Sequence, residues 1–193
     1  MLVAALLVLT LVVAAGYRFV GQNWDEYTHL HPDERFLTQV ASALGQASLF
    51  GEGGAPGYFD TFGSQLNPNN RGYGFYVYGT LPLFTVKGVA SLLTALTGDP
   101  VYVGYNGVHL VGRAVSAVAD LITILVTFLI GRRLFGRWAG LLGAMFYAGA
   151  AHAIQLAHFF TTDAFTVVPV ALAMWFAVRV MDEDRWYDYA LFG

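Results

Sequence analysis

The feature that most constrains this chain is a series of long apolar stretches without charge. Residues 138–162 and 164–178 contain no Asp, Glu, Lys or Arg, and neither do residues 1–17. A helix needs about 20 such residues to cross the hydrocarbon core of a bilayer. Only 12% of the 193 residues are charged, roughly half the share found in soluble domains. The sequence therefore predicts an all-α integral membrane protein and argues against a disordered or soluble chain.

Four transmembrane helices are expected, at about 2–20, 112–131, 138–159 and 164–181. We interpret the first as a retained anchor. A cleavable signal peptide, the alternative, would need a basic amino-terminal region that this chain lacks. Residues 21–111 then form one large loop, rich in Asn, Gly and aromatic residues in its first part. We expect it to contain interfacial helices at about 32–46 and 80–97.

Charge distribution fixes the expected topology. Arg132, Arg133 and Arg137 form the densest basic cluster, and short basic loops stay in the cytoplasm. If residues 80–97 do not cross, an N-in chain places this cluster inside and places Asp33 and Asp163 on the opposite, extracytoplasmic face. The net charge of −3 and the lack of a polybasic segment argue against nucleic acid as a partner. The absence of cysteine excludes disulfide and thiolate chemistry.

The segment HPDERFL at 31–37 has the pattern of a helix start. Proline favours the first helical position, and the amino-terminal dipole favours Asp33 and Glu34. These acids could serve the helix alone or could carry chemistry. His29, His31 and Asp33 alternate in a way that could bind a divalent metal. That geometry requires an extended chain, which Pro32 and the helix interrupt.

Three further polar features remain open between structure and function. Asp163 could cap the last span or act at its mouth. Asp120 lies in the middle of a span, where a carboxylate needs a partner, and we expect Lys87 or Arg113 to neutralise it. The segment NPNNRGYG at 67–74 suits a phosphate or sugar, and equally an ordinary turn.

The order of these features resembles the amino-terminal part of the polyprenyl-phosphate-dependent membrane glycosyltransferases of the C superfamily. The nearest branch comprises the bacterial relatives of protein O-mannosyltransferases and of lipid A aminoarabinose transferases. The matching segments, in chain order, are HPDERFL at 31–37, YGTLPLF at 78–84, GRAVSA at 112–117, GRRLFG at 131–136 and TDAF at 162–165. Each segment is weak alone, and the resemblance depends on their order and spacing.

This resemblance implies an inverting transferase that moves a sugar from a polyprenyl-phosphate carrier to a lipid or protein acceptor. The reaction would occur at the extracytoplasmic face of a bacterial plasma membrane. By matching position, Asp33 becomes the catalytic base, while Glu34 and Asp163 support the acceptor or a neighbouring polar group. Many relatives carry a lysine before the proline of the interfacial helix, but this chain has Thr80-Leu81 before Pro82.

The charge for the lipid phosphate must therefore come from Arg71, Lys87 or Arg113. His31 is a further candidate for substrate binding. The resemblance establishes no cofactor, and a divalent metal could assist the departing phosphate. Because family members have several hundred residues, we expect this chain to be the amino-terminal part of one transferase domain. Two rival functions remain: a transporter or channel subunit that uses Asp120, Asp163 and Lys87, and a non-catalytic membrane scaffold.

Overall fold

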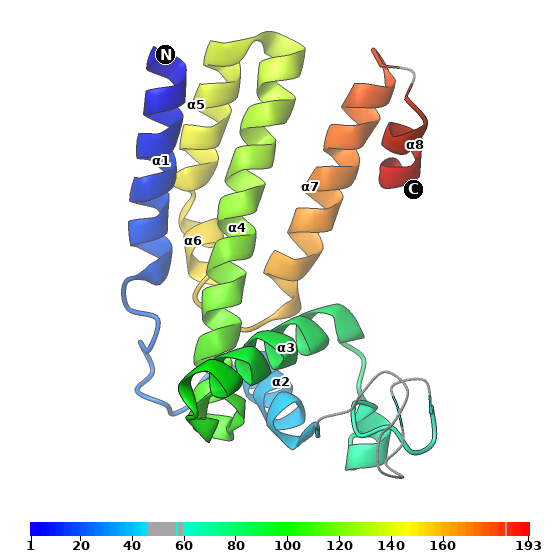
Figure 1. Cartoon of the computed structure of the whole chain (residues 1–193). Coiled ribbons are helices and arrows are strands. Elements are labelled where there is room, and N and C mark those ends of the chain that lie inside the picture. The colour runs from blue at the N-terminus through cyan, green and yellow to red at the C-terminus, as the bar shows by residue number, and fades with distance from the viewer. Residues whose placement is uncertain (46–56, 58–59, 184) are drawn as a thin grey trace. The chain divides into compact units, whose positions relative to one another are not determined.

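The computed structural model describes residues 1–45, 57, 60–183 and 185–193, and the regular structure within them is entirely helical (Figure 1). Four of the described helices are long and apolar enough to cross a membrane: α1 (Leu2–Phe19), α3 (Thr80–Thr97), α4 (Tyr105–Phe135) and α7 (Thr162–Val180). The prediction of an all-α membrane protein is confirmed at this level. Residues 46–56 and 58–59 of the expected loop lie outside the described part.

The chain divides into two compact units. The first unit, residues 1–24 and 113–193, contains α1, the greater part of α4, and α7. It also contains α5 (Arg137–Ala148), α6 (Ala151–Leu156) and α8 (Trp186–Phe192). The second unit, residues 25–112, contains α2 (Pro32–Ala43), the 3-10 turn η1 (Pro68–Arg71), α3, the 3-10 turn η2 (Pro100–Val103) and the first turns of α4.

The set of candidate spans differs from the expected set at two places. Residues 138–159, expected to form one span, are divided between α5 and α6, with the chain leaving the helix at Gly149. Residues 80–97 form α3 with the predicted bounds, but α3 has the length and hydropathy of a candidate span. Hydropathy could not reveal the break within residues 138–159, because the residues on both sides of Gly149 are apolar.

The break after α5 is stabilised by a buried polar network in the first unit. Arg18 on α1 is fully buried, and its Nη1 donates to the carbonyl oxygen of Ala148 at 3.1 Å, at the end of α5. Its Nε donates to the carboxylate of Asp120 on α4. The Tyr147 hydroxyl donates to the second Asp120 oxygen at 2.9 Å. A buried helix end needs such donors, because its last carbonyl groups have no partner within the helix.

This network corrects one sequence-based expectation. Asp120 is paired, as expected of an acid within a span, but its partner is Arg18 and not Lys87 or Arg113. The hydrogen bonds from Arg18 and Tyr147 engage both carboxylate oxygens of Asp120.

The sharp turn between α4 and α5 depends on glycine. Gly136 has φ of 90°, a left-handed conformation that other residues rarely adopt. The two helices then approach so closely that a Cβ on Gly140 would lie 2.5 Å from the backbone nitrogen of Arg132. This close packing brings the first unit's helices together around Ala144 and Ile124.

In the second unit, α2 packs against α3. The buried residues of α2 include Leu37, Val40 and Ala41, and those of α3 include Leu83 and Val86. Because these residues recur every three or four positions, one face of α2 is buried and the other remains open. The open face presents Asp33 to solvent.

Candidate functional site

The start of α2 has the predicted helix-start chemistry. His31 occupies the N-cap position, and its Nδ1 accepts the Glu34 backbone N–H at 3.4 Å. Pro32 takes the first helical position. The two acids that follow have opposite environments, since Asp33 is exposed and Glu34 is fully buried. Of this pair, Asp33 is the carboxylate that a substrate in solution or at a membrane surface could reach.

A tyrosine holds the Asp33 carboxylate. The Tyr78 hydroxyl donates to Oδ1 of Asp33 at 2.8 Å, from the segment just before α3. This hydrogen bond to Asp33 raises the pKa of the Tyr78 phenol, so the phenol remains a donor to higher pH. One carboxylate oxygen is thereby fixed, which orients the other oxygen of Asp33. Sequence reasoning missed Tyr78, although it lies within the matched segment YGTLPLF.

Three tyrosine rings lie close to an aromatic side chain of α2. Phe36 on α2 lies 5.7 Å from the Tyr78 ring, 6.3 Å from Tyr76 and 6.0 Å from Tyr73, between ring centroids. The Tyr73 hydroxyl donates to the Gln39 carbonyl oxygen at 3.3 Å. Burial raises the pKa of Tyr76 to about 12. These rings form a surface with apolar faces and polar tips beside the carboxylate.

A pocket of about 290 Å³ lies at the start of α3, two residues after Tyr78. It is lined by Thr61, Ser64, Leu66, Asn67, Pro68, Thr80 and Phe84. The Asn67 side chain is already engaged, because it accepts the Asn69 backbone N–H at 3.1 Å and donates to the Thr61 carbonyl oxygen at 2.8 Å. The segment 67–74 therefore forms a turn, and this turn contributes one wall of a pocket with hydroxyl groups and an apolar floor.

Two of the predicted phosphate-binding cations meet at the far end of α2. Arg71 Nε donates to the Ala43 carbonyl oxygen at 2.7 Å, and Lys87 Nζ donates to that of Ala41 at 3.2 Å. Cations at this position satisfy carbonyl groups that lack a partner at a helix end. Ala41 and Ala43 lie eight and ten positions after Asp33, so these carbonyls lie about 12 and 15 Å from Asp33 along the helix axis. Lys87 is buried and Arg71 is exposed.

Arg113, the third predicted cation, belongs to the first unit and is fully buried. Its Nη1 donates to the Gln22 carbonyl oxygen at 2.6 Å, and its guanidinium lies 5.3 Å from the centroid of the Trp24 ring. These contacts anchor the chain that follows α1. The structure therefore gives Arg113 a clear packing role.

Asp163 also belongs to the first unit, where it is exposed in the first turn of α7. It does not occupy the N-cap position, which belongs to Thr161, and instead accepts the Thr161 hydroxyl at 2.8 Å. The preceding segment is tied to the end of α1, because His158 Nε2 lies 3.0 Å from the Val20 carbonyl oxygen. Trp24 packs edge-on against Phe159 at 5.5 Å. Asp163 thus lies at the same end of the first unit as the end of α1.

The alternating histidines and Asp33 do not assemble a metal site. Within the described residues, no three His, Cys, Asp or Glu side chains form a group that could hold a metal ion. His31 is used as the α2 cap, and Asp33 accepts from Tyr78. His29 is buried, with a left-handed φ of 52°, and its ring lies 4.3 Å from that of His109 between centroids.

Together, the four candidate spans and the all-helical fold define an integral membrane protein. A family model described as dolichyl-phosphate-mannose-protein mannosyltransferase matches residues 80–193. Since this match covers more than half of the chain, the chain belongs to that family of membrane glycosyltransferases, which use a sugar carried on a polyprenyl phosphate. The matched residues include Asp163 and begin after Asp33. Neither the search of curated proteins nor that of solved structures found a match.

Proposed function

We propose that this protein transfers a sugar from a polyprenyl-phosphate carrier to a hydroxyl group of a lipid or protein acceptor, at the extracytoplasmic membrane face. Family membership supports the donor class and the membrane location. The observation that carries the assignment of the base is the exposed Asp33 carboxylate, which Tyr78 orients through a hydrogen bond to one of its oxygens. That arrangement suits a group that must accept a proton from a substrate alcohol.

In the proposed reaction, the free oxygen of Asp33 takes the proton of the acceptor hydroxyl. The acceptor oxygen attacks the anomeric carbon as the bond from that carbon to the phosphate oxygen breaks. The bonding electrons leave with the phosphate, and the configuration of the anomeric carbon inverts. Tyr78 keeps the carboxylate in position throughout, because its hydroxyl donates to the other oxygen.

The remaining candidates take supporting roles in this proposal. Buried Glu34 and the capping His31 hold the first turn of α2, and therefore Asp33, in place. Asp163, exposed and oriented by Thr161, serves a polar group of the acceptor. Of the three cations, we assign the lipid phosphate to Arg71, because it is the exposed one. To reach the reaction, its side chain must release the Ala43 carbonyl oxygen and turn along α2.

The test is reconstitution of the full-length protein in liposomes with a radiolabelled polyprenyl-phosphate sugar and a membrane-impermeant acceptor. We expect label to move to an acceptor added outside right-side-out vesicles, with an anomeric configuration opposite to that of the donor. A product of retained configuration would refute the single displacement. Absence of transfer, combined with an ion flux that disappears in Asp120→Asn, would support the transporter alternative instead.

A further inference from the structure

Two exposed arginines lie where α4 ends and α5 begins, in the first unit. Arg132 belongs to the last turn of α4, and Arg137 is the first residue of α5, with the turn at Gly136 between them. Both side chains are exposed. Within the described residues, neither makes an ion pair or a side-chain hydrogen bond. We refer to residues 132–138 as the α4–α5 turn.

The neighbouring cations differ from these two because they have acidic partners within the protein. The other described arginines at this end of the unit are paired: Arg133 with Asp182 and Glu183, Arg179 with Glu183 and Asp188, and Arg185 with Glu183. Their positive charges are thereby compensated inside the chain. The charges of the α4–α5 turn are left for an anion outside it.

Helix electrostatics does not account for Arg137. The amino-terminal end of a helix carries partial positive charge, so a cation there is unfavourable for the helix. Arg137 occupies this end of α5, and the first turn of α5 contains no acid. Arg132 lies at the opposite kind of helix end, where a cation is favourable. A negative group bound beside Arg137 would remove the conflict between its charge and the helix.

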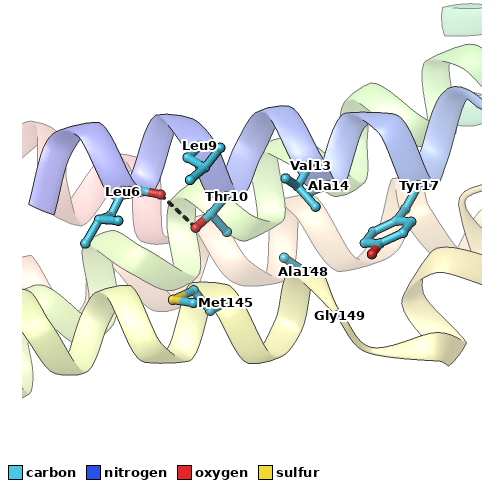
Figure 2. Close-up of a pocket in the computed structure, with 9 residues that line it drawn as sticks. All are labelled: Leu6, Leu9, Thr10, Val13, Ala14, Tyr17, Met145, Ala148 and Gly149. Carbon is cyan, nitrogen blue, oxygen red and sulfur yellow. Dashed lines mark hydrogen bonds between the residues drawn. The ribbon is translucent and has the colours of Figure 1, made fainter.

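Three candidate membrane spans begin or end at the level of this turn. The first is α4 itself, and α7 ends beside it, because Arg133 of α4 pairs with Asp182 just after α7. Figure 2 shows α1 and α5 side by side and running in the same direction, so α1 begins at the end where α5 begins. The α4–α5 turn therefore lies where the first unit would meet a membrane surface.

Apolar side chains surround the two cations. Phe135 is 79% exposed and Trp138 is 48% exposed, and Leu134 is exposed as well. Tryptophan beside basic residues is typical of the headgroup level of a membrane. A free anion would satisfy the arginines but leave these side chains in water. A lipid with a negative headgroup would satisfy the arginines and cover the apolar side chains.

From these observations we infer that the α4–α5 turn binds anionic phospholipids. Arg132 and Arg137 contact the headgroup phosphates, and Phe135 and Trp138 contact the adjoining part of the acyl chains. The inference uses residues of the first unit only. It does not depend on sugar transfer, and its ligand is separate from the donor phosphate that we assign to Arg71.

The experiment measures the fluorescence of Trp138 in the full-length protein, reconstituted in mixed bilayers of phosphatidylcholine and phosphatidylglycerol. In one series the phosphatidylcholine carries bromine on its acyl chains, and in the other the phosphatidylglycerol does. Bromine quenches a tryptophan that it contacts, so quenching reports which lipid lies beside the turn. For every variant, the Trp138 signal is the difference from the same protein with Trp138→Phe.

We expect phosphatidylglycerol to be preferred beside Trp138 about fivefold, the effect of one arginine near an anionic headgroup. Added salt should lower the preference, because it screens exposed charges. Arg132→Gln/Arg137→Gln should remove the preference, and Arg132→Lys/Arg137→Lys should keep it. The control Arg185→Gln removes a charge at the same end that Glu183 already compensates, and it should also keep the preference.

Equal quenching by the two lipids in the wild type would overturn the inference. A preference that survives in Arg132→Gln/Arg137→Gln, or that Arg185→Gln removes as fully, would do the same. Displacement of phosphatidylglycerol by millimolar inorganic phosphate would indicate a site for free anions and refute the lipid assignment. If the double variant does not fold, Arg132→Gln and Arg137→Gln are measured singly, and each should lower the preference.

Discussion

Replacing Arg18 by methionine removes the cation at the centre of the first unit's buried network. Arg18 is fully buried, pairs with Asp120 and donates to the carbonyl oxygens of Ala14 and Ala148. Arg18→Met leaves Asp120 as a buried carboxylate without its counter-charge. Loss of one partner of such a pair costs about 3–5 kcal/mol of the free energy of unfolding. For a chain of this size, that loss lowers the melting temperature by roughly 6–20 °C.

The double variant Arg18→Met/Asp120→Leu separates the pair from the capping contact. With both charges gone, no buried charge is left unpaired, and the costs that remain are the carbonyl oxygen at the end of α5 and the Tyr147 hydroxyl, each of which loses its partner, about 1–3 kcal/mol apiece. The double variant should therefore be more stable than Arg18→Met alone. Exposed Arg35→Met on α2 is the control, with a change within about 0.5 kcal/mol.

These stabilities are measured from tryptophan fluorescence during thermal unfolding in detergent. An Arg18→Met variant as stable as the wild type would refute the importance of the pair. If the stability lost in the double variant equals the sum of the losses in Arg18→Met and Asp120→Leu, the two residues act independently, contrary to their contact in the structure.

Three further outcomes follow from the second unit. Tyr78→Phe removes the hydrogen bond to Asp33 and should lower the transfer rate roughly 10- to 100-fold, the range for a bond to a charged group. Tyr73→Phe, the control, should leave the transfer rate unchanged. Burial raises the pKa of the Tyr76 phenol from 10.0 to about 12. The stability that the protonated phenol contributes is therefore present below pH 10 and is lost between pH 10 and about 12. The difference in ultraviolet titration between wild type and Tyr76→Phe should show one phenol that ionises near pH 12. Arg71→Met should raise the KM for the lipid donor with kcat unchanged if Arg71 contacts the phosphate, and an unchanged KM would remove it from the site.

Local features of the fold could be predicted from the sequence because they depend on neighbouring residues. The α2 start is an example: His31, Pro32 and the following acids determine the cap within one turn. The bounds of α3 were also predicted, since Gly79 and Gly98 flank an apolar helix with positive φ at both positions. In each case the signal lies within a few residues of the feature.

Contacts between distant residues could not be predicted in this way. Arg18 and Asp120 are 102 positions apart, and Tyr78 and Asp33 are 45 apart. Either acid could have paired with several basic or polar side chains. The division of residues 138–159 also depends on such a contact, because Arg18 supplies the donor that the end of α5 needs. The two cations at the end of α2 were recognised as candidates, while their bonds to its carbonyl groups depend on the tertiary fold.

The most direct test of the account compares Asp33→Asn with Asp99→Asn in the reconstituted transfer reaction. In Asp33→Asn the amide oxygen can still accept from Tyr78, but the side chain cannot take a proton from the acceptor, and a general base contributes about 10²- to 10⁴-fold. Asp99 caps η2 through Oδ1, a contact that asparagine preserves. We predict that Asp33→Asn loses transfer by this factor while donor binding is retained, and that Asp99→Asn keeps the wild-type rate. Transfer by Asp33→Asn at the wild-type rate would contradict the assignment of Asp33 as the base.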